Sequence, residues 1–154
     1  MLHLCKLTDS LFISNSRSAC DDNLLLGEGV TFCINVSKQQ PFPGLRVGTL
    51  RVPVFDDPAE NLYKYFDRCA DAIEDAGGAG GRTLVYCKNG RSRSASICIA
   101  YLMKCRHLSL REAFEHLKSV RPSVEPNEGF WAQLQRYESE LQSRQSGTIS
   151  SANG

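Results

Sequence analysis

Apolar residues along this chain fall into short runs that alternate with longer segments of helical spacing. The runs at 10–14, 30–36, 49–55 and 83–87 are rich in β-branched and aromatic residues, a pattern typical of strands. The last run, TLVYC, is apolar almost throughout, which predicts a strand buried on both faces of a parallel sheet. Pro53 lies inside the third run and indicates an edge position or a bulge.

Four segments carry apolar residues at the spacing of a helix. The first, at 62–76, ends at a Gly-Gly pair. The second, at 95–104, is apolar on almost every side and predicts a buried central helix, while the third, at 109–120, opens with the capping box Ser-Leu-Arg-Glu. The last follows a Pro-Asn pair and reaches Leu141. Strands that alternate with helices, and then helices alone, predict an α/β domain with a mostly parallel sheet flanked by helices.

The length and composition fit a single globular domain. The chain has 154 residues, of which 42% are hydrophobic and 23% charged, so a disordered or collagen-like chain is excluded. We expect one domain at 1–142. From residue 143 the sequence SRQSGTISSANG has little to bury, and it predicts a disordered tail at 143–154.

Charge and cysteine usage narrow the possible partners and the cellular setting. The 18 Lys and Arg residues nearly balance the 17 Asp and Glu residues, which argues against binding to nucleic acid or to an anionic membrane. No apolar run approaches the roughly 18–20 residues of a membrane span, and the N-terminus lacks the pattern of a signal peptide. The seven cysteines are odd in number and lie mostly in apolar runs. They favour a reducing intracellular setting, so we expect a cytoplasmic location, with the nucleus as a second option.

Metal and cofactor binding are not indicated. The chain has no Cys-x-x-Cys motif, and His3, His107 and His116 are not spaced with cysteines as zinc ligands would be. We therefore expect no metal and no cofactor.

The candidate chemistry lies between the 83–87 strand and the next helix, in the sequence CKNGRSRS at 87–94. A loop between a buried strand and a buried helix directs backbone N–H groups at an anion, and the helix dipole adds positive potential. The same surroundings favour the thiolate of Cys87, which is the nucleophilic form. Arg93 follows six residues later, and its planar guanidinium can fold back and hold two phosphate oxygens at once.

The Cys-x5-Arg spacing alone is weak support, because the chain contains a second match from Cys105 to Arg111. That copy has no glycine and straddles the end of one predicted helix and the capping box of the next, so it cannot cradle an anion. Cys87 differs in having Gly90, a strand before it and a helix after it. The alternative is that Cys87 is an ordinary buried cysteine at the end of a strand.

With these residues in view, the chain resembles the dual-specificity protein tyrosine phosphatases, specifically the small atypical members that lack a targeting domain. The resemblance runs from about residue 10 to residue 141 and includes GVTFCINVS, CKNGRSRS, AYLM and RPSVEPNEGFWAQL. It implies a metal-independent phosphate-monoester hydrolase that acts through a cysteinyl-phosphate. The implied substrate is a phosphorylated protein or a small phosphomonoester.

The resemblance also implies roles for the residues of this loop. Cys87 is the nucleophile, and Ser94 hydrogen-bonds the sulfur and helps it leave. The phosphate is held by the Arg93 side chain and by the backbone amides of Lys88, Asn89, Gly90, Arg91, Ser92 and Arg93.

The mechanism also needs an acid, because the leaving alkoxide or phenoxide must be protonated. Asp56 and Asp57 are the candidates, and chemistry alone does not choose between them. The family pattern places the acid five residues before the Asn61-Leu62 pair, which selects Asp56. The alternative is that either aspartate simply caps a turn before the following proline. Asn127 is implied to steady the phosphate loop, although an Asn after Pro can equally be a helix N-cap.

One residue departs from the family pattern. The family has a histidine immediately before the nucleophile, whereas this chain has Tyr86. A phenol is neutral at pH 7 and offers no cationic partner, so we expect weak activity. The alternative is that Tyr86 is an aromatic core residue, since its neighbours Leu84 and Val85 are apolar. The positive charges of Lys88 and Arg91 either offset part of the missing histidine charge or form a solvated rim of the site.

Three functions are consistent with these features. The first is a slow protein phosphatase, the second is a phosphatase-like binding module for phosphorylated ligands, and the third is a phosphatase for a phospholipid head group or an RNA 5′ end. Cys87, Arg93, Ser94 and an acid candidate are all present, which favours an enzyme over a binding module. The balanced net charge argues mildly against RNA. A sulfur-transfer enzyme also uses a cysteine in an anion-binding loop, but it would not need Asp56.

Overall fold

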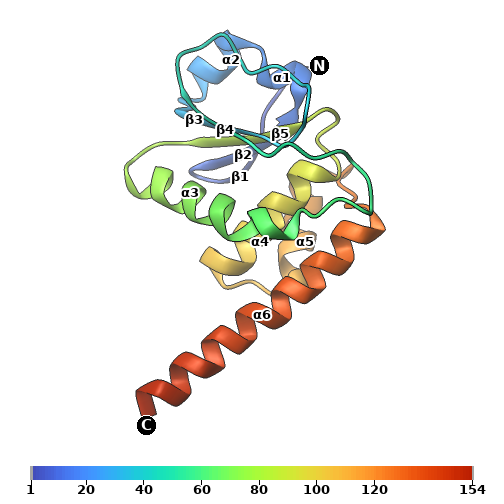
Figure 1. The fold of residues 1–154 in the computed structure, drawn as a ribbon. Helices are drawn as coiled ribbons and strands as arrows, with labels where there is room; N and C mark the ends of the chain where they lie inside the picture. The colour runs from blue at the N-terminus through green and yellow to red at the C-terminus, as the bar shows by residue number, and fades with distance from the viewer. Residues whose placement is uncertain (1, 154) are drawn as a thin grey trace.

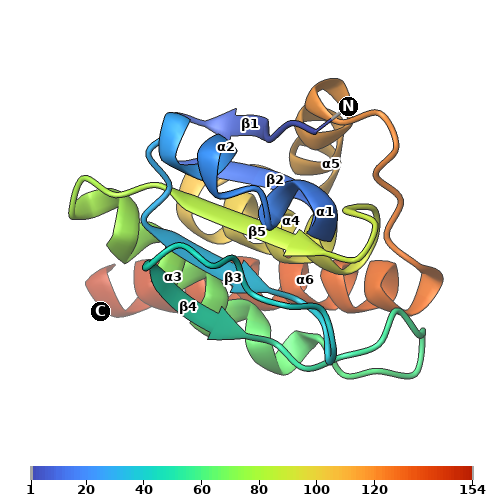
Figure 2. The same cartoon turned by 90° about the horizontal axis from the view of Figure 1, so that it is seen from above.

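The structure, a computed structural model, describes the backbone of residues 2–153 and the side chains of residues 2–147. Five strands form one sheet in the spatial order β1-β2-β5-β3-β4, and every neighbouring pair is parallel except β1 with β2 (Figure 2). The strands are β1 (Cys5–Thr8), β2 (Leu11–Asn15), β3 (Phe32–Asn35), β4 (Gly48–Arg51) and β5 (Thr83–Cys87). The predicted α/β class with a mostly parallel sheet is confirmed.

Helices cover both faces of the sheet (Figure 1). The short helices α1 and α2 lie on one face, and the four longer helices lie on the other. The helical elements are α1 (Ser16–Ala19), α2 (Asp22–Gly27), the 3₁₀ turn η1 (Tyr63–Tyr65), α3 (Phe66–Gly78), α4 (Arg93–Arg106), α5 (Leu110–Val120) and α6 (Glu128–Asn153). The predicted capping box is present at the start of α5, where Ser109 and Glu112 each accept a hydrogen bond from the other's backbone N–H.

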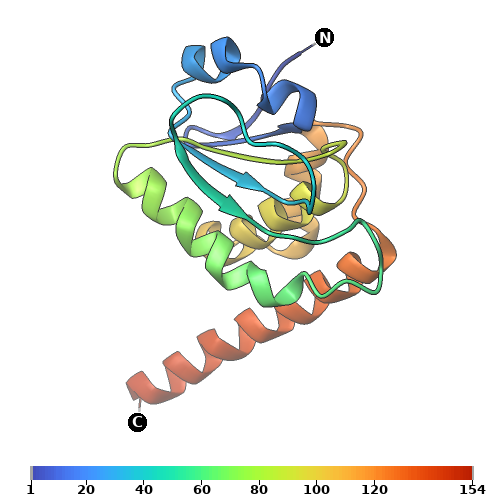
Figure 3. The same cartoon turned by 45° about the horizontal axis from the view of Figure 1, so that its top comes forward.

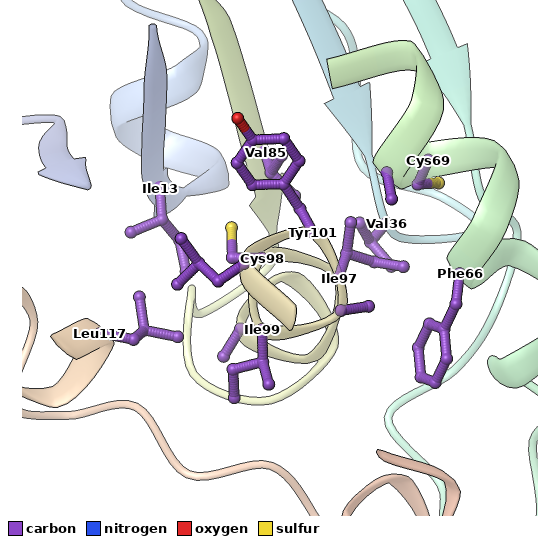
Figure 4. Packing of buried hydrophobic residues seen from close by; sticks show 14 of the residues in the cluster. Ile13, Val36, Phe66, Cys69, Val85, Ile97, Cys98, Ile99, Tyr101 and Leu117 are labelled. Carbon is purple, nitrogen blue, oxygen red and sulfur yellow. The ribbon is translucent and has the colours of Figure 1, made fainter. Parts of the chain in front are cut away.

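Helix α4 is the centre of the larger helical layer. Its residues from Ser94 to Met103 are all buried, as its apolar character on every side predicted. Figure 4 shows Ile97, Cys98 and Ile99 between side chains of the sheet and of the neighbouring helices. Full burial of such a side chain contributes about 1.5–3 kcal/mol. The packing therefore fixes α4, and with it the first helical turn, which carries Arg93 and Ser94.

The structure differs from the sequence prediction at the sheet edges. Strand β1 was not predicted, because its four residues are defined mainly by pairing with β2. The run at 49–55 was predicted as one strand, but β4 ends at Arg51. Val52 still donates its N–H to Asn35 O at 2.9 Å, and Pro53 then has no N–H with which to continue the ladder.

Helix α6 continues past residue 142 up to Asn153. The disordered tail expected at 143–154 overlaps this stretch and stays a prediction. Arg144 supports this continuation, since its guanidinium donates to both carboxylate oxygens of Asp67 at 2.9 Å and to Glu140 at 3.1 Å. Within the described residues, no helix combines the length and the apolar character needed to cross a membrane.

Candidate active site

The loop between β5 and α4 lies at the carboxyl edge of the parallel strands (Figure 2). Strand β5 is buried throughout and pairs with β2 on one side and β3 on the other. Crevices outside the carboxyl ends of parallel strands are the usual ligand sites of such sheets. The turn requires Gly90, whose φ is +65° and whose position leaves no room for a side chain: a Cβ there would lie 2.7 Å from Ser14 O.

Cys87 and Ser94 meet at the base of this loop. The Cys87 Sγ lies 3.1 Å from the Ser94 Oγ, and both residues are buried. Ser94 is in the first turn of α4, whose N-terminus carries positive potential. The arrangement gives a charged sulfur a hydroxyl donor and a favourable dipole, as a nucleophile and leaving group requires.

Arg93 folds across the loop from the first position of α4. Its Nη1 donates to Val54 O at 3.0 Å, which ties the guanidinium to the segment after β4. Its Nε is buried and has no hydrogen-bond partner among the described residues. A buried donor of this kind costs about 1–3 kcal/mol when left unpaired, so it is available to an oxygen of a bound ligand.

The structure distinguishes the two aspartates. Asp56 Oδ1 accepts a hydrogen bond from Asn127 Nδ2 at 2.9 Å, across the site from Cys87. Asp57 instead caps the turn that follows it: its Oδ1 accepts from Ala59 N at 2.8 Å and its carbonyl accepts from Glu60 N at 3.0 Å. Asp57 therefore has the turn-capping role, while Asp56 faces the cavity.

Asn127 is both a helix cap and a link to the phosphate loop. Its Oδ1 accepts from Phe130 N at 2.9 Å in the first turn of α6, which is the N-cap arrangement. Its backbone N–H donates to Ser92 Oγ at 2.9 Å, and its amide nitrogen donates to Asp56. Asn127 therefore caps α6 and also links this helix to the loop and to Asp56.

These groups surround a small cavity of about 170 Å³. The cavity is lined by Asp56, Cys87, Asn89, Arg91, Ser92, Arg93, Glu125 and Asn127. Lys88, Gly90, Ser94 and Tyr86 are not in its lining. The side chain of Lys88 is exposed, Gly90 turns the loop and Ser94 lies beneath the sulfur.

Glu125 is a lining residue that the sequence analysis did not single out. Its Oε2 lies 3.3 Å from Arg91 Nη2, and its N–H donates to Arg91 O at 2.7 Å. This pair is largely exposed, with side-chain exposures of 55% for Arg91 and 74% for Glu125, so it forms the solvated rim of the cavity. The only signal in the sequence was the position of Glu125 two residues before Asn127.

Tyr86 lies on the face of the sheet opposite to Cys87. Its phenol packs with Phe12 and Leu84 in a second, smaller core, and its O–H donates to Pro41 O at 2.8 Å. Burial raises the pKa of Tyr86 above its ordinary value, so the phenol keeps its proton. Side chains alternate between the faces of a strand, so Tyr86 points away from Cys87. In the structure Tyr86 packs as an aromatic core residue.

The second Cys-x5-Arg match does not form a site. Burial raises the pKa of Cys105 to about 11, and its Sγ donates to Ala70 O at 3.7 Å. Arg111 is exposed on α5 and pairs with Glu115 at 3.0 Å. No group of three or more His, Cys, Asp or Glu side chains is placed to hold a metal ion in the part of the chain that the structure describes.

Comparison with known proteins gives one consistent family. The family model described as dual specificity phosphatase, catalytic domain, matches residues 11–140. Human dual specificity phosphatase 28 is 54% identical over 142 residues, which cover 92% of this chain and 81% of the relative.

Two solved structures extend this likeness to three dimensions. The crystal structure of a tyrosine-to-histidine variant of human dual specificity phosphatase 28 has a TM-score of 0.91 and 52% identity, covering 92% of this chain and 98% of that one. A mouse dual specificity phosphatase complexed with zinc tungstate has the same TM-score and identity, covering 94% of this chain and 91% of that one. By sequence, fold and the loop at the carboxyl edge of its sheet, the chain belongs to the dual specificity phosphatase family of protein phosphatases.

Proposed function

We propose that this chain hydrolyses phosphate monoesters on proteins through a cysteinyl-phosphate formed on Cys87, without a metal ion. One observation carries the proposal: a single small cavity is lined by a sulfur nucleophile, a guanidinium and a carboxylic acid candidate. Cys87, Arg93 and Asp56 come from β5, α4 and the segment after β4. Together they fill the roles of nucleophile, oxyanion stabiliser and acid.

The geometry supports a two-step displacement. In the first step the Cys87 thiolate attacks phosphorus, the bond to the leaving oxygen breaks, and the Asp56 carboxylic acid protonates that oxygen. In the second step water attacks the cysteinyl-phosphate, Asp56 accepts its proton, and the sulfur leaves as a thiolate that the Ser94 hydroxyl stabilises. Arg93 and the loop amides balance the charge on the phosphoryl oxygens in both steps.

Turnover of an aryl phosphate in the presence of EDTA tests this function. We expect hydrolysis to persist with EDTA and to be inhibited by vanadate, because no step uses a metal and vanadate resembles the transferring phosphoryl group. Turnover that EDTA abolishes, or that vanadate leaves unchanged, would contradict the proposal.

Asp56→Asn is expected to slow hydrolysis of a substrate with a poor leaving group by about 10²–10⁴, the usual contribution of a general acid. It should matter far less for an activated aryl phosphate, whose phenolate leaves without a proton. Asp57→Asn is the matched control, because Asp57 caps a turn outside the cavity. Steady-state kinetics with alkyl and aryl phosphates give the comparison. If Asp57→Asn shows the leaving-group dependence and Asp56→Asn does not, the acid is wrongly assigned.

We also propose that the activity is weak, because Tyr86 provides no positive charge beside the nucleophile. An ordinary thiol with a pKa of about 8.5 is about 3% ionised at pH 7, so the loss of all such help costs at most about thirtyfold. A more basic thiolate is also the better nucleophile, which recovers part of that loss. The α4 N-terminus, the loop amides and Arg93 remain in place. The enzyme is therefore slowed by Tyr86 and still active.

Tyr86→His is expected to raise kcat/KM near pH 6, with a smaller gain near pH 8 where an imidazole has lost its charge. Neighbouring side chains on a strand point to opposite faces, so an imidazolium would lie roughly 8–10 Å from the sulfur. At an effective dielectric of about 20 its attraction for a thiolate is about 2 kcal/mol, more than tenfold in the ionised fraction. Rate–pH profiles and iodoacetamide alkylation measure this effect.

Tyr86→Phe is the matched control for this change, since it removes the hydrogen bond to Pro41 and adds no charge. Pro41 O still accepts hydrogen bonds from Asn35 Nδ2 at 3.4 Å and from Cys20 Sγ at 3.7 Å, so the change should lower stability by only about 0.5–1.5 kcal/mol, and it should not increase the alkylation rate. An alkylation profile that is the same in Tyr86→His and wild type would remove the ionisation argument and leave Tyr86 with a packing role only.

A further inference from the structure

The segment between α5 and α6 runs along the outside of the phosphate loop. Figures 2 and 3 show this segment, in orange, beside the loop that joins β5 to α4. Arg121 begins the segment and donates twice to the loop: Nε to Gly90 O at 2.8 Å and Nη2 to Asn89 O at 3.1 Å. Its Nη1 lies 3.5 Å from the Cys5 Sγ on β1, which fixes the third corner of the guanidinium.

Consecutive backbone carbonyls on the outside of the loop each accept a hydrogen bond from a neighbouring segment. Lys88 O accepts from Ser16 N at 3.2 Å, and Arg91 O accepts from Glu125 N at 2.7 Å. The carbonyls of Asn89 and Gly90 lie between these two, and Arg121 bonds both of them. Four consecutive carbonyls are therefore held on the outside of the loop, and one side chain holds two of the four.

Holding the carbonyls outward determines where the amides point. In a trans peptide the N–H points away from the C=O of the same unit, and the structure contains no cis peptide bonds among the described residues. The carbonyls of Asn89 and Gly90 share their peptide units with the N–H groups of Gly90 and Arg91. These N–H groups are thus directed inward, to the side where the cavity is lined by Asn89, Arg91 and Ser92.

We propose that Arg121 is a positioning residue that keeps the phosphate loop in its anion-binding form before any anion is present. The inference rests on the proposed function, since it assigns Arg121 to the same site. A guanidinium suits this task because its Nε and Nη2 hydrogens lie side by side in one plane and reach two neighbouring carbonyls. A lysine ammonium at the end of a flexible chain has no such fixed pair of donors.

Arg121→Lys is expected to weaken tungstate binding at least tenfold, as measured by calorimetry, and to lower kcat/KM by a similar factor. The acidic limb of the kcat/KM profile should move to higher pH, because amides that no longer converge on the cavity stabilise the thiolate less. Arg111→Lys on α5 is the matched control, since Arg111 is exposed and pairs with Glu115, outside the cavity. It should leave binding and kinetics unchanged.

Arg121→Ala with added guanidinium chloride gives a second, independent test. We expect millimolar guanidinium to restore part of the tungstate affinity, while the same concentration of sodium chloride restores none. If Arg121→Lys is too unstable to purify, this rescue decides the question at low temperature. A folded Arg121→Lys variant that has a lower Tm but binds tungstate within twofold of wild type would assign Arg121 a merely structural role and overturn the inference.

The outcomes separate this inference from the proposed function. Tungstate binding needs no turnover, so it reports on the loop even if the chain hydrolyses nothing. Normal turnover with unchanged tungstate affinity in Arg121→Lys would overturn the role of Arg121 alone. Weakened tungstate binding in Arg121→Lys, together with a wild-type protein that shows no turnover, would support the inference and contradict the proposed function.

Discussion

Cys87→Ser is expected to reduce hydrolysis by at least about a thousandfold, as loss of a catalytic nucleophile does. A serine hydroxyl stays protonated at neutral pH, and the residues that line the cavity include no histidine to remove its proton. The fold should be unaffected, since Cys87 is buried beside Ser94 and the substitution changes one atom. Steady-state turnover of an aryl phosphate, with calorimetric binding of tungstate, measures both effects.

Cys105→Ser is the control for this substitution, because it alters the second Cys-x5-Arg match. Cys105 donates to Ala70 O, a bond that a serine hydroxyl can also make, so turnover should remain close to wild type. Residual turnover in Cys87→Ser above a tenth of the wild-type rate would assign the chemistry to another group.

Arg93→Lys is expected to lower kcat/KM by at least about a hundredfold, comparable to the loss of a transition-state donor. The structure supplies the reason. Arg93 uses Nη1 to hold Val54 O and keeps its buried Nε free for a ligand. One lysine ammonium cannot keep the anchoring bond and also present a fixed pair of donors to the phosphoryl oxygens. The variant should lose kcat more than substrate affinity, because these contacts strengthen in the transition state.

Arg91→Lys provides the contrast for Arg93→Lys within the same loop. Arg91 pairs with Glu125 at the exposed rim, where a charge pair contributes little, so we expect a loss below tenfold. Kinetics of both variants with one aryl phosphate make the comparison. If Arg93→Lys loses no more activity than Arg91→Lys, the site needs only a positive charge at residue 93. The claim that the Arg93 guanidinium holds two phosphoryl oxygens at once is then wrong.

Features set by local sequence were predicted well. Strand β5 was predicted with its observed bounds because five consecutive buried residues need both sheet faces covered. The capping box of α5 depends only on Ser109 and Glu112, which are three residues apart. The cavity position of Cys87 and Arg93 follows from one strand, one loop and one helix in sequence. These arrangements depend on residues that are close together in the sequence.

Features that depend on distant contacts could not be predicted. Chemistry alone left Asp56 and Asp57 open, and only the family resemblance selected Asp56; the contact that separates the two in the structure comes from Asn127, 71 residues away. Arg121 reaches Gly90 from 31 residues away, and no spacing rule connects the two. The side of the sheet on which Tyr86 lies could have been predicted, because side chains alternate along a strand and Tyr86 precedes Cys87. The hydrogen bond from Tyr86 to Pro41 could not have been predicted, since a long loop brings Pro41 to the phenol.

Acid quench of the wild-type enzyme during turnover, followed by peptide mass spectrometry, tests the central claim most directly. We predict that the peptide containing Cys87 gains the mass of one phosphoryl group, that iodine treatment, which cleaves a phosphorus–sulfur bond, removes this group, and that Cys87→Ser shows none of it. Turnover that leaves a phosphoryl group on another side chain, or on no side chain under conditions where product accumulates in a burst, would contradict the assignment of Cys87 as the nucleophile.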